Sequence, residues 1–118
     1  MKPASLLVCA LLLGLGAASA QAMSIRELRT LESNEKEGKL LANYYLVGVM
    51  EGLREGSDTA LREHQKAPFC IEGRKIEPVM ARSLYQTELT RNADSYEADM
   101  PVQLVMLSAL RTSYRCTH

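Results

Sequence analysis

Leu40 to Leu53 reads LLANYYLVGVMEGL and decides the fold of this chain. Its apolar residues recur at helical spacing, so the stretch predicts a helix that follows the charged turn at Glu35. One side of this helix carries Leu41, Tyr45, Gly48, Val49, Gly52 and Leu53, and Leu40, Tyr44 and Val47 widen the apolar stripe. A helix that is apolar around most of its circumference is expected at the centre of the domain, covered by other helices.

Tyr45, Gly48 and Gly52 form a candidate helix-packing motif within this stretch. Gly48 and Gly52 are four residues apart and therefore share one face of the helix. Each glycine costs a helix interior about 1 kcal/mol relative to alanine, so we expect close packing of another helix to offset that cost. A membrane dimerisation face is disfavoured, because Glu51 and Arg54 lie on the same helix.

The residues on either side of the central helix predict a short first helix and a break. Ser24 and Glu27 have the spacing of a capping box, and they predict a helix that ends near Ser33-Asn34. After the central helix, Gly56-Ser57-Asp58 predicts a break or a kink.

Two more helices are predicted in the second half of the chain. Pro78 fits the first turn of a third helix, and Asp99 is placed to cap a fourth helix that has Pro101 in its first turn. Their expected inner faces carry Val79, Met80 and Leu84 in the third helix, and Val102, Val105, Met106, Ala109 and Leu110 in the fourth. The fold class is therefore all-α, a small four- to five-helix bundle over residues 21–118.

Residues 1–20 have the three parts of a cleavable secretory signal peptide. Lys2 supplies the positive charge, Leu6 to Gly16 form a short apolar run, and Ala18-Ser19-Ala20 is a small-residue cleavage signal. Cleavage after residue 22 is the alternative. The apolar run is too short to span a bilayer comfortably, so we expect an exported, periplasmic protein without stable membrane insertion.

The domain that follows keeps two cysteines, Cys70 and Cys116. An oxidising compartment favours a disulfide, and two thiols allow one intramolecular pairing. Closing a loop of this length should stabilise the fold by about 4 kcal/mol in the chain-entropy description. A redox pair or a metal site is the weaker interpretation, because no CxxC motif occurs and only His64 and His118 could join as ligands.

Composition and motifs favour a protein without enzymatic activity. Basic and acidic residues balance at 14 each, and no basic patch is interleaved with aromatic residues, so nucleic acid is not an expected partner. No Ser/His/Asp arrangement, HExxH motif or phosphate-binding glycine loop is present. The sequence therefore predicts a non-catalytic protein with no metal and no cofactor.

Four segments follow the signal peptide in a specific order and cover most of the remaining chain: Tyr45-Leu46-Val47-Gly48 with Gly52, Phe69-Cys70-Ile71, Ser108-Ala109-Leu110, and Tyr114-Arg115-Cys116. In this order and spacing the chain resembles the Tai-type (Rap/Tai) immunity proteins. Members of that family protect bacteria against peptidoglycan amidases delivered by type VI secretion. The chain departs from the family at Glu72 and Arg115, where members often have proline.

The resemblance implies a helical periplasmic protein that blocks an amidase by inserting a surface loop into its active-site cleft. The expected partner is then a secreted amidase toxin, and a second copy of the chain is another candidate, because members are often dimeric. The candidate partner-binding residues lie in the connection between the third and fourth helices: Arg91, Asn92, Asp94, Ser95 and Tyr96. Of these, Arg91 and Tyr96 are the expected exposed anchors, and an ordinary solvated turn is the alternative interpretation.

A function of a different class also fits the size, the helices and the single disulfide. The chain resembles small disulfide-bonded periplasmic chaperones of acid stress, and its many carboxylates would protonate in acid. A general envelope protein is the least specific version of this alternative.

Overall fold

The computed structural model describes residues 22–34 and 36–117. In this part of the chain four α-helices form: α2 (Ile25–Asn34), α3 (Gly38–Arg62), α4 (Ala81–Arg91) and α5 (Val102–Ser113). Two 3-10 turns, Pro78–Met80 and Ala93–Ser95, flank α4. The described residues contain no β-strand apart from one isolated bridge between Ser24 and Pro101. The all-α fold class is confirmed, whereas the predicted signal peptide, residues 1–20, lies outside the described residues.

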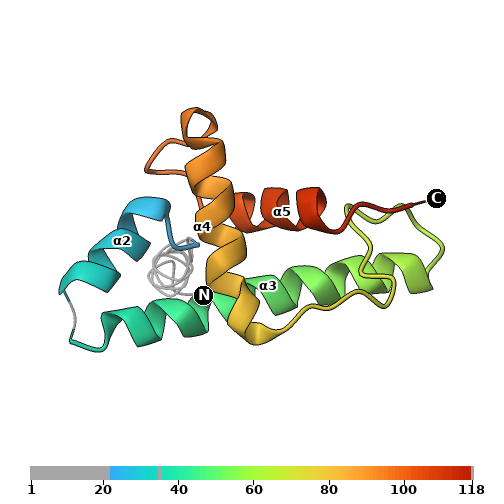
Figure 1. The fold of residues 1–118 in the computed structure, drawn as a ribbon, viewed down its shortest axis with the longest axis horizontal. Helices are drawn as coiled ribbons and strands as arrows, with labels where there is room; N and C mark the ends of the chain where they lie inside the picture. The colour runs from blue at the N-terminus through green and yellow to red at the C-terminus, as the bar shows by residue number, and fades with distance from the viewer. Residues whose placement is uncertain (1–21, 35, 118) are drawn as a thin grey trace, which may run out of the picture.

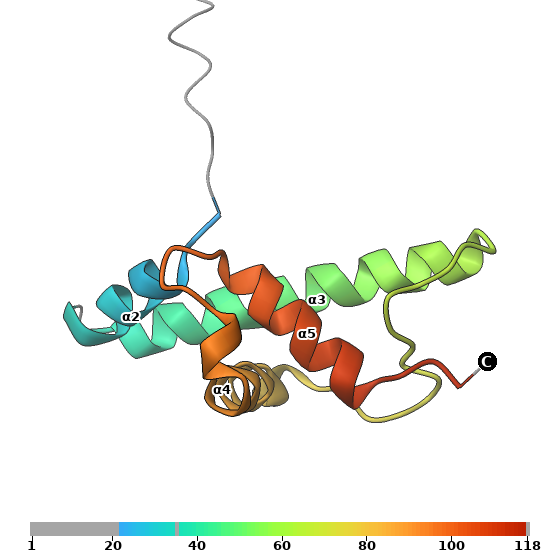
Figure 2. The same cartoon turned by 90° about the horizontal axis from the view of Figure 1, so that it is seen from above.

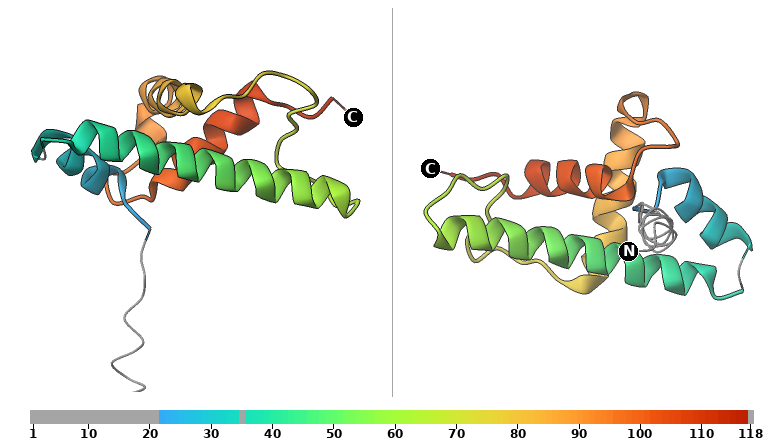
Figure 3. Two further views of the ribbon diagram at one scale, coloured as in Figure 1. Left: turned by 90° about the horizontal axis from the view of Figure 1, so that it is seen from below. Right: turned by 180° about the vertical axis from the view of Figure 1, so that it is seen from behind.

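The long helix α3 is the centre of the fold, as the sequence predicted. It contacts α2, α4 and α5. Figure 1 shows α2 beside the first half of α3, α4 running across it, and α5 above its second half. In the view from above in Figure 2, α4 is seen nearly end-on and α5 runs diagonally beside α3, and Figure 3 shows the same helices from below and from behind. None of the helices in the described residues has the length and apolar character needed to cross a membrane.

The core is formed by one contiguous cluster drawn from all four helices and the loop before α4. Full burial of a large apolar side chain contributes about 1.5–3 kcal/mol, so this cluster supplies most of the driving force for folding. The five residues predicted on the inner face of α5 are all buried. The cluster contains Ile25, Leu28, Ala42, Leu46, Met50, Phe69, Ile71, Ala81, Tyr85, Val102, Val105, Met106, Leu110 and Tyr114.

The buried face of α3 differs from the predicted one. Ala42, Leu46 and Met50 point into the core, whereas Leu41 and the glycines of the candidate packing motif are exposed. The predicted stripe was displaced by one position because this helix is apolar on nearly all sides, and helical spacing alone does not tell which apolar face is covered. Tyr44 also stays outside the core, with 68% of its surface exposed.

The expected break at Gly56-Ser57-Asp58 does not occur, and α3 continues without interruption to Arg62. Ser57 is buried, and its Oγ donates a hydrogen bond of 3.1 Å to the carbonyl oxygen of Phe69. This bond ties the helix to the following loop at the point where local helix propensity is lowest. The residues of low propensity therefore stay helical because tertiary contacts hold them.

The C-terminus of α3 has the hydrogen bonds of a Schellman motif. The backbone N–H of His64 donates to the carbonyl of Leu61 (3.1 Å), and that of Gln65 donates to the carbonyl of Ala60 (2.8 Å). His64 therefore occupies the left-handed position, with φ of 57°, where glycine is the usual residue. The helix ends here despite the unfavourable conformation of the histidine.

The N-terminus of α2 matches the prediction. The backbone N–H of Ser24 donates to Glu27 Oε1 (3.3 Å), and the backbone N–H of Glu27 donates to Ser24 Oγ (3.1 Å). These two bonds form the predicted capping box.

Two predictions about the later helices were wrong. Asp99 does not cap α5, because the helix starts two residues later than predicted, after Pro101, and the Val102 N–H donates to the carbonyl of Met23 at 3.0 Å. Pro78 starts the 3-10 turn before α4, as expected, but Val79 is 81% exposed and lies outside the core.

The predicted disulfide between Cys70 and Cys116 is present, with an S–S distance of 1.99 Å across 46 residues of sequence. The Cys70 N–H also donates to the carbonyl of Tyr114 (2.8 Å). Arg74 lies 5.5 Å above the Tyr114 ring and donates to the carbonyl of Arg115 (2.8 Å). Hydrogen bonds, a cation–π contact and the disulfide thus join the C-terminal segment to the loop before α4.

The turn after Cys70 has two successive residues in the left-handed backbone region. Glu72 has φ of 52° and Gly73 has φ of 76°. Proline fixes φ near −65°, so it cannot occupy position 72 in this backbone conformation.

Candidate functional site

The predicted partner-binding connection forms a loop, residues 92–101, at the end of α4 that lies away from α3 (Figure 1). Its base is organised by Glu88, which is 7% exposed. The hydroxyl of Tyr96 donates to Glu88 Oε1 (2.5 Å), and Nδ2 of Asn92 donates to Glu88 Oε2 (3.1 Å). Both carboxylate oxygens therefore have donors, which makes burial of this charged group tolerable.

The second half of the loop is held by the N-terminus of α2. The Ile25 N–H donates to the carbonyl of Met100 (3.0 Å), and the Arg26 N–H donates to the carbonyl of Ala98 (2.9 Å). The first N–H groups of a helix have no partners within the helix, so the loop supplies acceptors for them. The loop is consequently held at both ends, while its tip is exposed.

The structure places the five predicted partner-binding residues in three different settings. Asp94 and Ser95 lie in the 3-10 turn at the tip and are exposed. Asn92 and Tyr96 direct polar atoms to Glu88, and Tyr96 is half-buried, so the expectation that it is an exposed anchor was wrong. Arg91 is exposed, but it lies at the end of α4 beside a cleft and outside the loop.

The acid–base properties at the loop base suit a structural role. Burial raises the pKa of Tyr96, and the hydrogen bond to Glu88 raises it further. At neutral pH the hydroxyl therefore keeps its proton and acts as a donor. Because the hydroxyl is protonated and hydrogen-bonded, it stabilises the loop and is not prepared to react.

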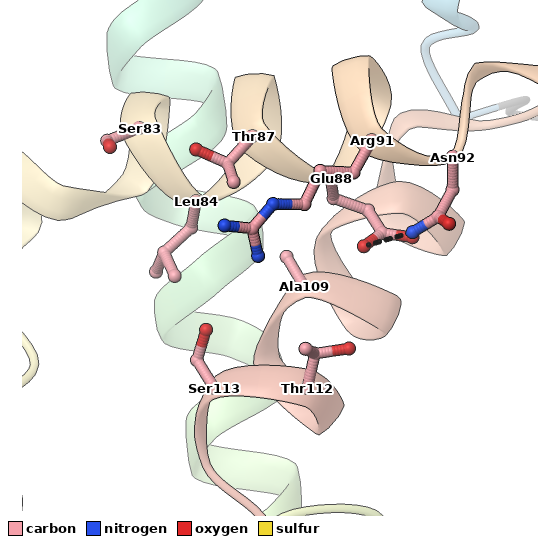
Figure 4. Close-up of a pocket in the computed structure, with 9 residues that line it drawn as sticks. All are labelled: Ser83, Leu84, Thr87, Glu88, Arg91, Asn92, Ala109, Thr112 and Ser113. Carbon is pink, nitrogen blue, oxygen red and sulfur yellow. Dashed lines mark hydrogen bonds between the residues drawn. The ribbon is translucent and has the colours of Figure 1, made fainter.

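A cleft of about 290 Å³ lies between α4 and α5 next to the loop base. Figure 4 shows the Arg91 side chain extending over it from α4, with Thr87 on the same helix and Thr112 and Ser113 below on α5. The Ser113 hydroxyl and the guanidinium point toward one another, whereas Glu88 turns toward Asn92. Leu84 and Ala109 supply apolar walls. The sequence did not single out this cleft, because its members come from two successive helices, and helical spacing alone does not tell which of their faces meet.

An apolar patch lies at the opposite end of α4. Leu40, Tyr44 and Val79 are 51%, 68% and 81% exposed, and a groove of about 380 Å³ runs between them. Arg82 borders the groove but is paired with Glu32 (3.1 Å). We call Leu40, Tyr44 and Val79 the α3–α4 patch.

The candidate packing motif, Tyr45, Gly48 and Gly52, shares no residue with this patch. Within the described residues, no atom lies within 4 Å of a Cβ built on Gly48 or Gly52, so the expected close packing of another helix does not form inside this chain. Tyr45 does take part in packing, because its hydroxyl accepts a hydrogen bond from the Met23 N–H (3.2 Å). The prediction that these residues take part in packing was therefore correct for Tyr45, and the prediction of an intramolecular groove at Gly48 and Gly52 was wrong.

The described residues contain no cluster of three or more histidine, cysteine, aspartate or glutamate side chains that could hold a metal ion. His64 is exposed at the end of α3, and His118 lies outside the described residues.

Comparisons with protein-family models, curated proteins and solved structures found no match.

Proposed function

We propose that this chain is a non-catalytic periplasmic binding protein that neutralises a peptidoglycan amidase by inserting loop 92–101 into its active site. The observation that carries the proposal is the construction of the loop. Glu88 fixes its first half, the N-terminus of α2 fixes its second half, and Asp94 and Ser95 are left exposed at the tip.

A loop of this kind suits inhibition by occlusion. Ordering a flexible segment on binding costs conformational entropy, and a loop already held in one shape avoids most of that cost. The tip carries small polar side chains that can enter a narrow cleft, while α4 supplies a rigid base. The resemblance to amidase immunity proteins, which act through a surface loop, agrees with this arrangement.

A tight complex requires more contact area than the tip alone provides. Stable protein–protein interfaces bury about 800 Å² on each partner, with anchors near the centre. The exposed Arg91 lies directly beside the loop and is of an anchor type. We therefore place the contact surface over the loop tip and the adjoining end of α4.

Periplasmic expression of the neighbouring amidase-like genes, with and without this protein, tests the proposal. We expect the protein to prevent lysis, and we expect Asp94→Arg to abolish protection because it puts a long cation at the tip. Glu51→Arg is the matched control, since it makes the same charge change at an exposed position of α3. Equal lysis with and without the protein would refute the proposal. Equal protection by both variants would show that the loop is not the inhibitory element.

A second candidate function, a chaperone of acid stress, is favoured by the α3–α4 patch. Exposed apolar surface of this kind can hold unfolded chains. If this is the function, the protein suppresses aggregation of a client at acid pH, and Val79→Asp removes that activity. Asp94→Arg would leave it unchanged, so the two variants separate the two functions.

A further inference from the structure

The cleft between α4 and α5 gathers hydrogen-bond donors that have no partner among the described residues. No hydrogen bond or ion pair in the described part of the chain involves the guanidinium of Arg91, although the structure pairs other arginines such as Arg82. The hydroxyls of Thr87, Thr112 and Ser113 likewise make no hydrogen bond within the described residues. Guanidinium groups donate only, and hydroxyls can donate, so the matching ligand is an acceptor.

The charges in the cleft indicate which class of hydrogen-bond acceptor it can bind. Arg91 brings one positive charge, and Glu88 brings one negative charge whose two oxygens already have donors from Tyr96 and Asn92. A ligand with a single negative charge can pair with the guanidinium, whereas a doubly charged phosphate meets stronger repulsion from Glu88. A carboxylate matches the planar fork of an arginine and accepts two parallel hydrogen bonds from it.

The size and walls of the cleft indicate what carries that carboxylate. A volume of about 290 Å³ is at the lower limit for small-molecule sites and is large enough for one acidic side chain. Leu84 and Ala109 line the cleft beside the polar groups and can contact the methylene groups of such a side chain.

We propose that the α4–α5 cleft binds a carboxylate through Arg91, with Ser113 and its neighbouring hydroxyls as additional donors. The carboxylate belongs either to an acidic side chain of a partner protein or to a small free carboxylic acid. The site itself does not depend on the proposed function, and only the assignment to a partner rests on it.

Titration with butyrate, followed by the backbone amide chemical shifts of Thr87, Thr112 and Ser113, tests the site directly. We expect saturable shifts with butyrate and none with its neutral isostere butyramide. Arg91→Gln should weaken butyrate binding about ten-fold or more, because it removes the charge-assisted pair. Arg111→Gln, at an exposed position of α5 outside the cleft, should bind like the wild type. Equal shifts with both probes, no saturation, or unchanged binding by Arg91→Gln would each overturn the site.

Affinity for the amidase then separates the two sources of the carboxylate. A loss of amidase binding in Arg91→Gln but not in Arg111→Gln assigns the carboxylate to the partner protein. Unchanged amidase binding assigns it to a small free acid. If the wild type binds no amidase, the proposed function fails, while the butyrate titration still decides whether the cleft is a carboxylate site.

Discussion

Replacing Tyr96 by phenylalanine should loosen loop 92–101 without unfolding the domain. The substitution keeps the ring and removes the hydroxyl that donates to Glu88 Oε1. Glu88 is 7% exposed, so this oxygen would lose its donor in a place that water reaches poorly. Hydrogen bonds to charged groups contribute about 1.5–3 kcal/mol. Because Tyr96 is only half-buried, we expect a loss near the lower end, about 1.5–2 kcal/mol.

Hydrogen exchange measures this loss where it arises. The Ser95 N–H donates to the carbonyl of Asn92 (2.9 Å) and the Tyr96 N–H to that of Ala93 (3.2 Å), so both amides report on opening of the loop. A loss of about 1.5–2 kcal/mol corresponds to roughly ten- to thirty-fold faster exchange at these amides. Tyr44→Phe is the control, since Tyr44 is exposed and its hydroxyl makes no hydrogen bond within the described residues.

A double-mutant cycle with Glu88→Gln isolates the pair from other effects. We expect a coupling free energy of about 1 kcal/mol or more between positions 88 and 96, because the two side chains are in direct contact. Wild-type exchange in Tyr96→Phe, or strict additivity in the cycle, would refute the idea that Glu88 organises the loop.

Three further outcomes concern the stability of the domain. Changing Cys70 and Cys116 to serine should lower the free energy of unfolding by about 4 kcal/mol, as measured by urea denaturation; a loss below about 1 kcal/mol would contradict the role of the 46-residue tether. His64→Gly should raise that free energy by roughly 0.5–1 kcal/mol, since glycine adopts φ of 57° without a Cβ clash, and a lower melting temperature would speak against this account. Tyr85→Phe should raise stability by about 1 kcal/mol, because the Tyr85 hydroxyl is buried without a partner. Burial raises the pKa of Tyr85 above its ordinary 10.0, so the wild type should keep full stability from this group below pH 10 and lose it as the pH rises through the raised pKa. The phenylalanine variant cannot ionise at this position and should lose less stability at alkaline pH. Identical pH profiles of stability for the two proteins would exclude the effect.

The predictions that succeeded depended on short-range rules. Ser24 and Glu27 are three residues apart, and the reciprocal hydrogen bonds that this spacing allows are formed. The disulfide followed from having only two cysteines in the predicted domain. The capping box depends on local spacing alone, and the disulfide had only one possible pairing. Neither prediction needed knowledge of tertiary packing.

The predictions that failed depended on which surfaces meet in space. Gly48 and Gly52 lie on a face of α3 that no other described segment covers, and Ser57 stays helical because a loop residue accepts its hydrogen bond. Glu88 was missed as the organiser of the loop because acidic residues are rarely buried. One signal did exist: Glu88 follows Ala81 and Tyr85 at helical spacing, and those two residues are in the core.

The loop and the α3–α4 patch lie at opposite ends of the same helix, and this separation allows the two candidate functions to be distinguished. The 3-10 turn and α4 together span about 20 Å, well beyond the range over which substitutions influence one another. If one partner covered both ends, Val79→Asp and Asp94→Arg would each weaken its binding, and their free-energy losses would add. If the ends serve different partners, each variant would affect one assay only. Measuring both variants and the double variant against the amidase and against an aggregating client therefore decides between one extended interface and two independent ones.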